Sequence, residues 1–290
     1  NAGINLGAWY TGGTMNTARR SLGGAGTQTS ALAFGGGQPA ADMGTKTESY
    51  NGTAWAEVND LNQSRLRLTG CGADNTAALA VSGEVPPGVS AVVESWNGYV
   101  WTEVNDVNTA RQDANVEGTS TAALFFGGGT PPGVGTIYAN TELWNGSNWT
   151  EVNDLNTARN KLAGAGTTTA ALAFGGNTPP LTGVTESWNG TSWTELNDLN
   201  TAREALAGVG TSTAALAFGG YDTAVTAATE SWNGTNWTNE NSLSLARQLL
   251  GGGGTSTSSL AFGGTPPQTG ATEEWDGTGF ITRTITTTSE

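Results

Sequence analysis

The stretch from Thr201 to Arg247, TAREALAGVGTSTAALAFGGYDTAVTAATESWNGTNWTNENSLSLAR, holds one complete unit of the pattern that decides the fold. It starts with Thr-Ala-Arg and a glycine-rich apolar segment, and it continues into the apolar run Ala214–Phe218, which ends on two glycines. After a variable stretch come Thr-Glu-Ser-Trp, an Asn-Gly pair and Thr-Asn-Trp-Thr. These short β-rich segments, separated by turn residues and lacking any helical period, predict four strands per unit.

The same unit recurs along the whole chain and can be aligned on one arginine. The six units begin near Arg19, Arg65, Arg111, Arg159, Arg203 and Arg247, at intervals of 46, 46, 48, 44 and 44 residues. Residues 1–18 hold an N-terminal outer strand and a link. A four-stranded unit with one aromatic face cannot bury that face alone, whereas stacked units bury a continuous core. The repeat therefore predicts one domain over residues 1–290.

The Asn-Gly pairs predict tight hairpins, because a two-residue type I′ turn needs positive φ at both central residues. Around Asn189-Gly190 such a turn would place Trp188 opposite Thr191 and Glu186 opposite Trp193. Glu186, Trp188 and Trp193 would then share one face. Strands near the axis of a ring are crowded, so we expect the glycine and alanine strands inside and the tryptophans outside.

An apolar run that ends in Gly-Gly, followed by an aromatic residue after a carboxylate and then by a tryptophan, resembles the kelch repeat. Unit two departs from this pattern at Ser82-Gly83, Tyr50 stands where later units have tryptophan, and Phe280 replaces the last outer tryptophan. The resemblance implies an all-β fold, a six-bladed kelch-type β-propeller with four antiparallel strands per blade. It also implies that the first strand of each unit is innermost and that the loops after Gly-Gly and before Arg open on one common face.

Two segments compete for the outer place in the last blade. Trp9 lies ten residues before Arg19, the same step as from Trp149 to Arg159, so it fits the repeat. Phe280–Thr287 alternates as a strand directly after an Asp-Gly turn, and such a local hairpin needs little loop closure. The sequence leaves both alternatives open. The excluded strand could support self-association through its edge.

The composition narrows the possible partners. The chain has 25 acidic and 11 basic residues and a net charge of −14, which argues against nucleic acid. No apolar run approaches the roughly 20 residues of a membrane span, so no membrane insertion is expected, and Asn1–Trp9 does not look like a signal peptide. Cys71 is the single cysteine, so no internal disulfide is possible. Histidine is absent, which removes the commonest general base and metal ligand, and no cofactor or metal is expected.

The six arginines allow two interpretations. At the start of each inner strand they would ring the channel mouth, where unpaired cations repel one another. Aspartates five residues earlier are the expected partners of four of them, so that the arginines clamp the links between blades: Asp60, Asp106, Asp154 and Asp198. The alternative is anion binding at the mouth. Arg19 and Arg247 have no such aspartate and are the candidates for it.

Other patterns in the repeat also have two interpretations. Asn153-Asp154-Leu155-Asn156 offers oxygen ligands for calcium, but such residues more often form Asx-turns. The Asn-x-Ser/Thr sequons follow largely from the hairpin chemistry, and the tryptophans that suggest sugar stacking stand at packing positions. Glycoside hydrolysis needs a pair of carboxylates, yet a catalytic pair would break the repeat, whereas the glutamates beside the aromatics recur in every unit. We therefore do not expect an enzyme, and a glycoside hydrolase ranks third among the hypotheses.

Differences between the units are concentrated in the loops between Gly-Gly and the following glutamate. The candidate ligand-binding residues in these loops are Asp42, Lys46, Glu84, Tyr138, Asn140, Tyr221 and Asp222. A stiff scaffold with variable loops on one face is a common design for binding, and simple tolerance of insertions is the alternative.

The leading functional hypothesis is a non-enzymatic binding or attachment protein for a glycan or protein ligand. The Thr/Asn/Gly-rich acidic composition resembles phage tail and surface-exposed proteins, which indicates an extracellular or virion surface. The second hypothesis is a structural decoration or spacer in a larger assembly.

Overall fold

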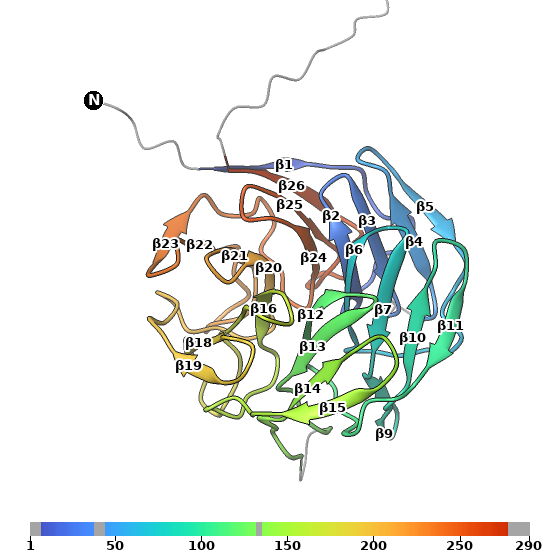
Figure 1. Cartoon of the computed structure of the whole chain (residues 1–290). Coiled ribbons are helices and arrows are strands. Elements are labelled where there is room, and N and C mark those ends of the chain that lie inside the picture. The colour runs from blue at the N-terminus through green and yellow to red at the C-terminus, as the bar shows by residue number, and fades with distance from the viewer. Residues whose placement is uncertain (1–6, 38–43, 132–134, 278–290) are drawn as a thin grey trace, which may run out of the picture.

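The structure, a computed structural model that describes residues 7–37, 44–131 and 135–277, is a ring of antiparallel sheets around a central axis (Figure 1). Six sheets of four strands each are the blades, and the described residues contain no helix. The predicted all-β, six-bladed propeller is confirmed.

Each blade runs from an innermost strand outward, as the sequence predicted. Blade 1 contains β2 (Gly23–Thr27), β3 (Ser30–Phe34), β4 (Thr47–Tyr50) and β5 (Trp55–Val58); blade 2 contains β6 (Thr69–Asp74), β7 (Ala77–Val81), β10 (Val93–Trp96) and β11 (Trp101–Val104); blade 3 contains β12 (Asn115–Thr119), β13 (Ala122–Phe126), β14 (Thr141–Trp144) and β15 (Trp149–Val152). Blade 4 contains β16 (Ala163–Gly166), β17 (Ala171–Phe174), β18 (Thr185–Trp188) and β19 (Trp193–Glu195); blade 5 contains β20 (Ala207–Thr211), β21 (Ala214–Phe218), β22 (Thr229–Trp232) and β23 (Trp237–Glu240); blade 6 contains β24 (Gly251–Gly254), β25 (Ser258–Phe262), β26 (Thr272–Asp276) and β1 (Ala8–Thr11). A short pair, β8 (Glu84–Val85) and β9 (Gly88–Val89), lies in the loop that follows β7.

The ring is closed by the N-terminal strand. β1 pairs antiparallel with β26, with Trp9 opposite Trp275. The indole N–H of Trp9 donates to Thr229 Oγ1 of blade 5 at 3.0 Å, the bond that the outer tryptophans of most other blades make to the blade before them. Trp9 therefore holds the outer place in blade 6. Phe280 and the rest of the competing segment, 280–287, lie outside the described residues. Self-association through that segment therefore stays a prediction.

The predicted two-residue hairpin turn is wrong, and the partner of each residue is shifted by two positions. Trp188 pairs with Trp193, so the loop has four residues, 189–192. The Asn189 side-chain oxygen accepts the main-chain N–H groups of residues 191 and 192, each at 2.9 Å, and Gly190 supplies the positive φ of 93°. Because the asparagine side chain caps the turn, positive φ is needed only at the glycine. Glu186 and both tryptophans still share one face, as predicted.

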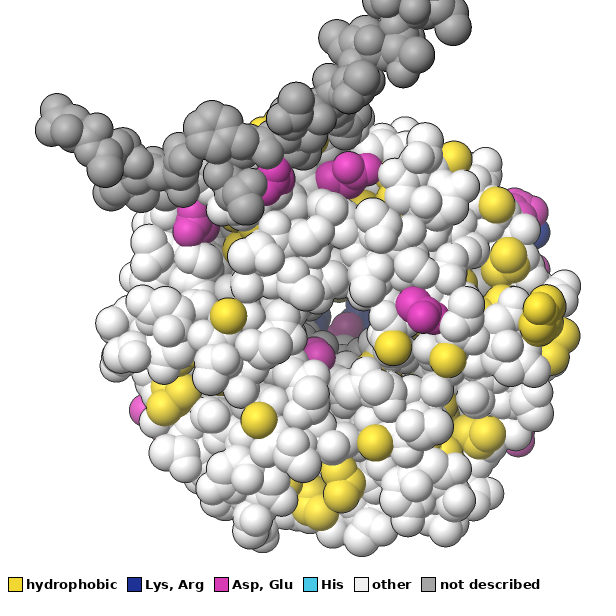
Figure 2. All heavy atoms as spheres, turned by 45° about the horizontal axis from the view of Figure 1, so that its top comes forward, with side chains coloured by type: hydrophobic (Ala, Val, Ile, Leu, Met, Phe, Trp, Pro, Cys, Tyr) yellow, Lys and Arg dark blue, Asp and Glu magenta, His cyan; other side chains and the backbone are white. Residues whose placement is uncertain are grey.

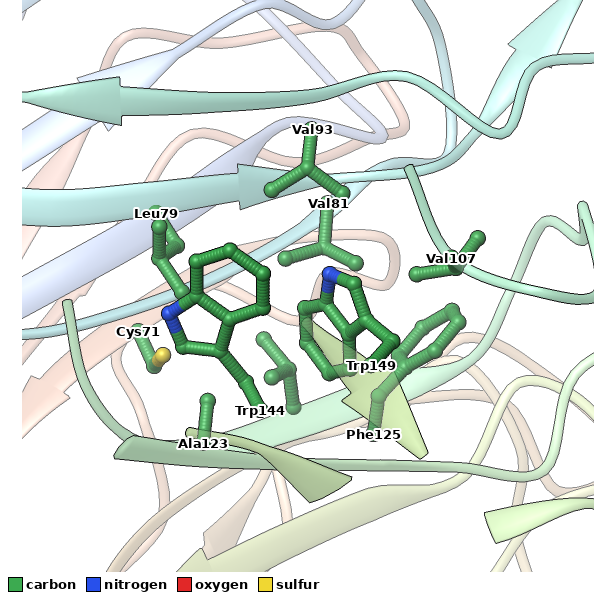
Figure 3. Close-up of a cluster of buried hydrophobic side chains, with 10 residues drawn as sticks. Cys71, Leu79, Val81, Val93, Val107, Ala123, Phe125, Trp144 and Trp149 are labelled. Carbon is green, nitrogen blue, oxygen red and sulfur yellow. The ribbon is translucent and has the colours of Figure 1, made fainter. Parts of the chain in front are cut away.

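The core is a set of aromatic clusters between successive blades. Figure 3 shows Trp144, Trp149 and Phe125 of blade 3 packed against Leu79 and other aliphatic side chains of blade 2. Equivalent clusters occupy the other interfaces. Each ring buries a large apolar area and edge-to-face contacts add to that burial, so the clusters hold neighbouring blades together.

A phenylalanine of one blade fits over a glycine of the next. A Cβ atom added to Gly208 of blade 5 would come 2.5 Å from Phe174 Cζ of blade 4, so only glycine leaves room for the ring. Four more interfaces repeat this arrangement, with Phe34 over Gly70, Phe126 over Gly164, Phe218 over Gly252 and Phe262 over Gly24. The interface between blades 2 and 3 differs, because Val81 replaces the phenylalanine and Val116 replaces the glycine within one cluster. Two valines there fill the space that a phenylalanine fills alone, over a glycine, at the other interfaces.

Candidate functional site

The six repeated arginines are buried and each pairs with a glutamate of the third strand in its blade. The N–O distances lie between 2.6 and 3.0 Å for Arg19–Glu48, Arg65–Glu94, Arg111–Glu142, Arg159–Glu186 and Arg247–Glu273, and Arg203 pairs with Glu230. All six arginines are 0% exposed. The prediction that Arg19 and Arg247 lie at the channel mouth is therefore wrong. Their guanidinium groups point away from the axis, into the blade.

The predicted aspartate partners are also wrong, although the clamping role of the arginines is supported. Asp154 and Asp198 accept the main-chain N–H of the threonine that begins the third strand, at 3.1 and 3.2 Å. Glu186 Oε1 accepts a hydrogen bond from Arg159 Nη1 at 2.9 Å, and Glu186 Oε2 accepts one from the main-chain N–H of Asn156 at 2.7 Å. Burial lowers the pKa of Arg159 and the nearby Glu186 opposes that shift. Each glutamate thus holds the link that enters its own blade.

A closed circle of main-chain hydrogen bonds surrounds the axis on the loop face. It joins the residues two positions after each arginine, namely Ser21, Arg67, Asp113, Lys161, Ala205 and Leu249, through N–O distances of 2.7 to 3.1 Å. Each of these residues has a φ between 51° and 55°, which is uncommon for non-glycine residues. The six hydrogen bonds stabilise this conformation at every position, so the backbone frame is the same in all blades.

The side chains on this frame differ in every blade. Arg67, Asp113 and Lys161 are consecutive members of the circle, and Ala205, Leu249 and Ser21 complete it. The loop after the second long strand of each blade lies next to the circle; for example, Glu204 bridges to Tyr221 in blade 5 and Leu66 bridges to Glu84 in blade 2. The two kinds of loop therefore meet on one face, as the resemblance implied. One half of the circle is charged and the other half is small or apolar.

Ion pairs hold the charged half in place. Arg67 Nη1 lies 3.0 Å from Asp113 Oδ2, and Arg67 Nε lies 3.2 Å from Glu84 Oε2. Lys161 Nζ lies 2.8 Å from Glu204 Oε1. Burial raises the pKa of the Asp113 carboxyl, while Arg67 and Lys161 act to lower it. Arg67 and Lys161 each keep 27% of their side-chain area exposed, so both remain within reach of a ligand.

An open depression of about 240 Å³ lies beside these residues. We call it the loop-face mouth, and its lining is Arg67, Lys161, Glu204, Ala205, Tyr221, Gln248 and Leu249. A channel of about 260 Å³ lined by the six innermost strands follows the axis. Figure 2 shows the central hollow of the ring, with acidic and basic side chains visible inside it.

Two of the seven predicted loop residues lie at or beside this mouth. Tyr221 lines it, and Glu84 pairs with Arg67. Asp222 follows Tyr221 and accepts a hydrogen bond from the main-chain N–H of Ala224 at 3.0 Å. That bond is the main cause that lowers the pKa of the Asp222 carboxyl, and a second bond from the main-chain N–H of Thr223 adds to it.

Three further predicted loop residues are described, and none of them is brought to the mouth. Lys46 Nζ lies 3.4 Å from Glu57 on the outer strand of blade 1. Asn140 donates to Glu151 of blade 3 at 3.2 Å. Tyr138 is half-buried and bonds through its main chain to Gly128. Asp42 lies outside the described residues.

Most residues that line the mouth were not predicted from the sequence, although the sequence contains a pattern that identifies them. The two residues after each repeated arginine are Arg-Ser, Leu-Arg, Gln-Asp, Asn-Lys, Glu-Ala and Gln-Leu in blades 1 to 6. Their surroundings repeat closely, so this dipeptide is a point of divergence with no change in length. Attention to loop length alone missed it.

The described part of the chain contains no cluster of three or more His, Cys, Asp or Glu side chains that could hold a metal ion. The Asn-Asp-x-Asn links instead use their side chains within the protein, as Asn153 does by donating to Thr191 O at 2.8 Å. Within the same residues, no helix is long and apolar enough to cross a membrane.

Comparison of the chain with models of protein families gives no match. Comparison with curated proteins gives none either.

Proposed function

We propose that this protein is a non-enzymatic, kelch-type binding propeller that takes a glycan at the loop-face mouth. The observation that carries the proposal is the contrast between frame and side chains. Six equivalent main-chain hydrogen bonds fix the circle, yet its side chains differ in every blade. A rigid frame that presents variable side chains is suited to recognition.

The chemistry of the mouth suits a ligand that has both polar and apolar faces. Arg67 and Lys161 supply hydrogen-bond donors, Glu204 supplies acceptors, and the Gln248 amide supplies both. Ala205, Leu249 and the ring of Tyr221 supply an apolar surface. A pyranose presents hydroxyl groups around its edge and C–H groups on its faces, and it complements such a lining.

The repeated glutamates do not support the alternative of a hydrolase. Glu186 is 0% exposed, and it is engaged by Arg159 and by main-chain N–H groups. Its equivalents are buried in the same way. A carboxylate held like this cannot reach a glycosidic bond. Placement on a virion or cell surface, where an attachment propeller would meet glycans, is part of the same proposal and is supported by the Thr/Asn/Gly-rich composition.

A glycan array tests the proposal when the wild type is compared with Tyr221→Ala and Gln248→Ala. We expect binding to a limited set of glycans, weakened at least several-fold by both substitutions, with melting temperatures close to the wild type. Ser212→Ala is the matched control, because Ser212 lies in the turn between β20 and β21 at the other end of the strand and should leave binding unchanged. Absence of glycan binding, or equal weakening by the control, contradicts the proposal.

A further inference from the structure

The axial channel contains one side chain pair that breaks the repeat. In the innermost strands, five blades carry Ala25, Cys71, Ala165, Val209 and Gly253 at the position where blade 3 carries Glu117. Two residues earlier, blade 3 has Asn115. The Asn115 amide donates to Glu117 Oε1 at 2.8 Å, and both residues line the channel.

Glu117 has no cationic partner among the described residues. Within these residues its contacts are Asn115 and a backbone hydrogen bond with Gly166 of blade 4. Desolvation raises the pKa of Glu117 to about 8, while Asn115 and Gly166 act to lower it. A carboxylate in such a place is stabilised by a cation, because burial otherwise disfavours its charged form.

The strands packed against Glu117 contribute little charge. β6 contributes the Cys71 thiol, whose pKa is raised by burial and by Glu117, and it ends on Asp74, which accepts hydrogen bonds from Thr76. β7, β13 and β16 contribute no ionisable side chain. Asp113 and Lys161 precede β12 and β16 at the mouth. Two cations directly precede these strands, Arg67 before β6 and Lys161 before β16, and both line the channel. Both are already paired, Arg67 with Asp113 and Glu84 and Lys161 with Glu204.

Several acceptor oxygens face the same space. Asn115 donates through Nδ2, and among the described residues its Oδ1 accepts no hydrogen bond. Each innermost strand pairs with only one neighbour, so its other edge offers unpaired carbonyl groups to the channel. A calcium ion needs six to eight oxygen ligands, often with several carboxylates, whereas a primary ammonium group needs three acceptors.

We propose that the channel wall at Asn115 and Glu117 is a binding site for a small primary alkylammonium ion. The carboxylate neutralises the charge, and Asn115 Oδ1 and a strand carbonyl accept the remaining N–H groups. The hollow seen in Figure 2 gives such an ion access from the surface. This site does not depend on glycan binding at the loop-face mouth.

Titration of the full chain with n-propylammonium chloride, followed by the NMR signals of the Asn115 side-chain amide and the Gly166 main-chain amide, tests the site. The reference is sodium chloride at the same ionic strength. At about pH 9 an alkylamine with a lysine-like pKa remains charged. We expect saturable shifts there, and an affinity about 100-fold weaker at about pH 6, because the pKa of Glu117 is about 8 and each unit below it lowers the carboxylate fraction about tenfold.

Glu117→Ala is the matched variant, since Ala25 and Ala165 occupy the same place in blades 1 and 4. It should keep the fold and bind n-propylammonium at least about tenfold more weakly, the scale of a charged hydrogen bond. Glu117→Gln keeps the shape and should lose the same affinity. Tetramethylammonium lacks N–H donors and should not bind. Equal binding by wild type and variants, equal binding of the two ions, or no saturable shift at about pH 9 overturns the proposal.

Discussion

The indole N–H of Trp149 is buried against the aliphatic side chains of Val81 and Val93 and has no hydrogen-bond acceptor among the described residues (Figure 3). In the other five blades the outer tryptophan donates to a threonine of the preceding blade, at 3.0 or 3.1 Å. Val93 takes the place of that threonine in blade 2. The interface between blades 2 and 3 therefore buries a polar group that the remaining interfaces satisfy.

Val93→Thr should increase stability, although a buried Val→Thr change usually reduces it. The new hydroxyl would accept the Trp149 N–H, and a hydrogen bond that satisfies a buried donor is worth about 1 kcal/mol. Chemical denaturation of wild type and variant measures the difference. Thr185→Val is the converse variant, because it removes the acceptor of Trp237 and should cost about 1 to 3 kcal/mol. A loss of stability in Val93→Thr would contradict this account.

The Phe174–Gly208 contact should be exchangeable for the valine pair of blades 2 and 3. Gly208→Val alone pushes a side chain into the Phe174 ring and should destabilise by about 1 to 3 kcal/mol. Phe174→Val alone leaves a cavity and should cost a similar amount or more. The double variant copies Val81 and Val116, so its loss should be clearly smaller than the sum of the two single losses. Additive losses in the denaturation cycle would show that the two side chains are not coupled.

How far the sequence predicted this molecule depends on whether a feature is repeated. Strand order, blade number and the inward glycines follow from local patterns that occur several times, so errors in one unit are corrected by the others. Trp9 could not be placed, because one position in the ring had two candidate strands and tertiary pairing decided between them. The partners of the arginines were missed because Glu186 is distant from Arg159 in sequence, whereas Asp154 is close.

The mouth and the channel could not be predicted from the repeat, because their residues differ between the units. Lys161, Glu204 and Glu117 have no repeated pattern, and each stands where another unit has a different residue. Which of these differences meet in space depends on the ring, since Lys161 and Glu204 are distant in sequence yet in contact. Divergence at constant length was visible in the sequence, but its location at one mouth was not.

Breaking one buried arginine–glutamate pair should cost much more than breaking an exposed pair. Glu186→Gln leaves the Arg159 charge without its counter-ion at 0% exposure, and such a loss is typically about 3 to 5 kcal/mol. Glu57→Gln is the control, because its pair with Lys46 is exposed and should contribute at most about 1 kcal/mol. Urea unfolding of both variants measures the contrast.

Replacing both Arg159 and Glu186 by methionine should not restore stability. An isolated buried pair can often be replaced by apolar residues, but Glu186 also accepts the main-chain N–H groups of Asn156 and Thr157, at 2.7 and 3.3 Å. These donors would lose their acceptor. Recovery of wild-type stability in the double variant would show that the glutamate acts only as a counter-ion.

The Glu117 carboxyl should make the protein less stable as the pH rises from weakly acidic to weakly basic. Its pKa in the folded protein is raised from 4.5 to about 8, chiefly by burial. The folded state therefore holds a proton that the unfolded state releases, and the stability that this proton confers is fully present below about pH 4.5 and lost as the pH rises through about 8. Since one pKa unit corresponds to about 1.4 kcal/mol, the total loss is at most about 5 kcal/mol.

Glu117→Gln removes the titration and leaves every other group in place, including Asp113. Between about pH 5 and pH 8.5, the unfolding free energy of the wild type should fall relative to that of Glu117→Gln, at low ionic strength and without amines. Glu57→Gln, which changes an exposed carboxylate, should follow the wild type across that range. Parallel curves for wild type and Glu117→Gln would show that the carboxyl titrates normally in the channel.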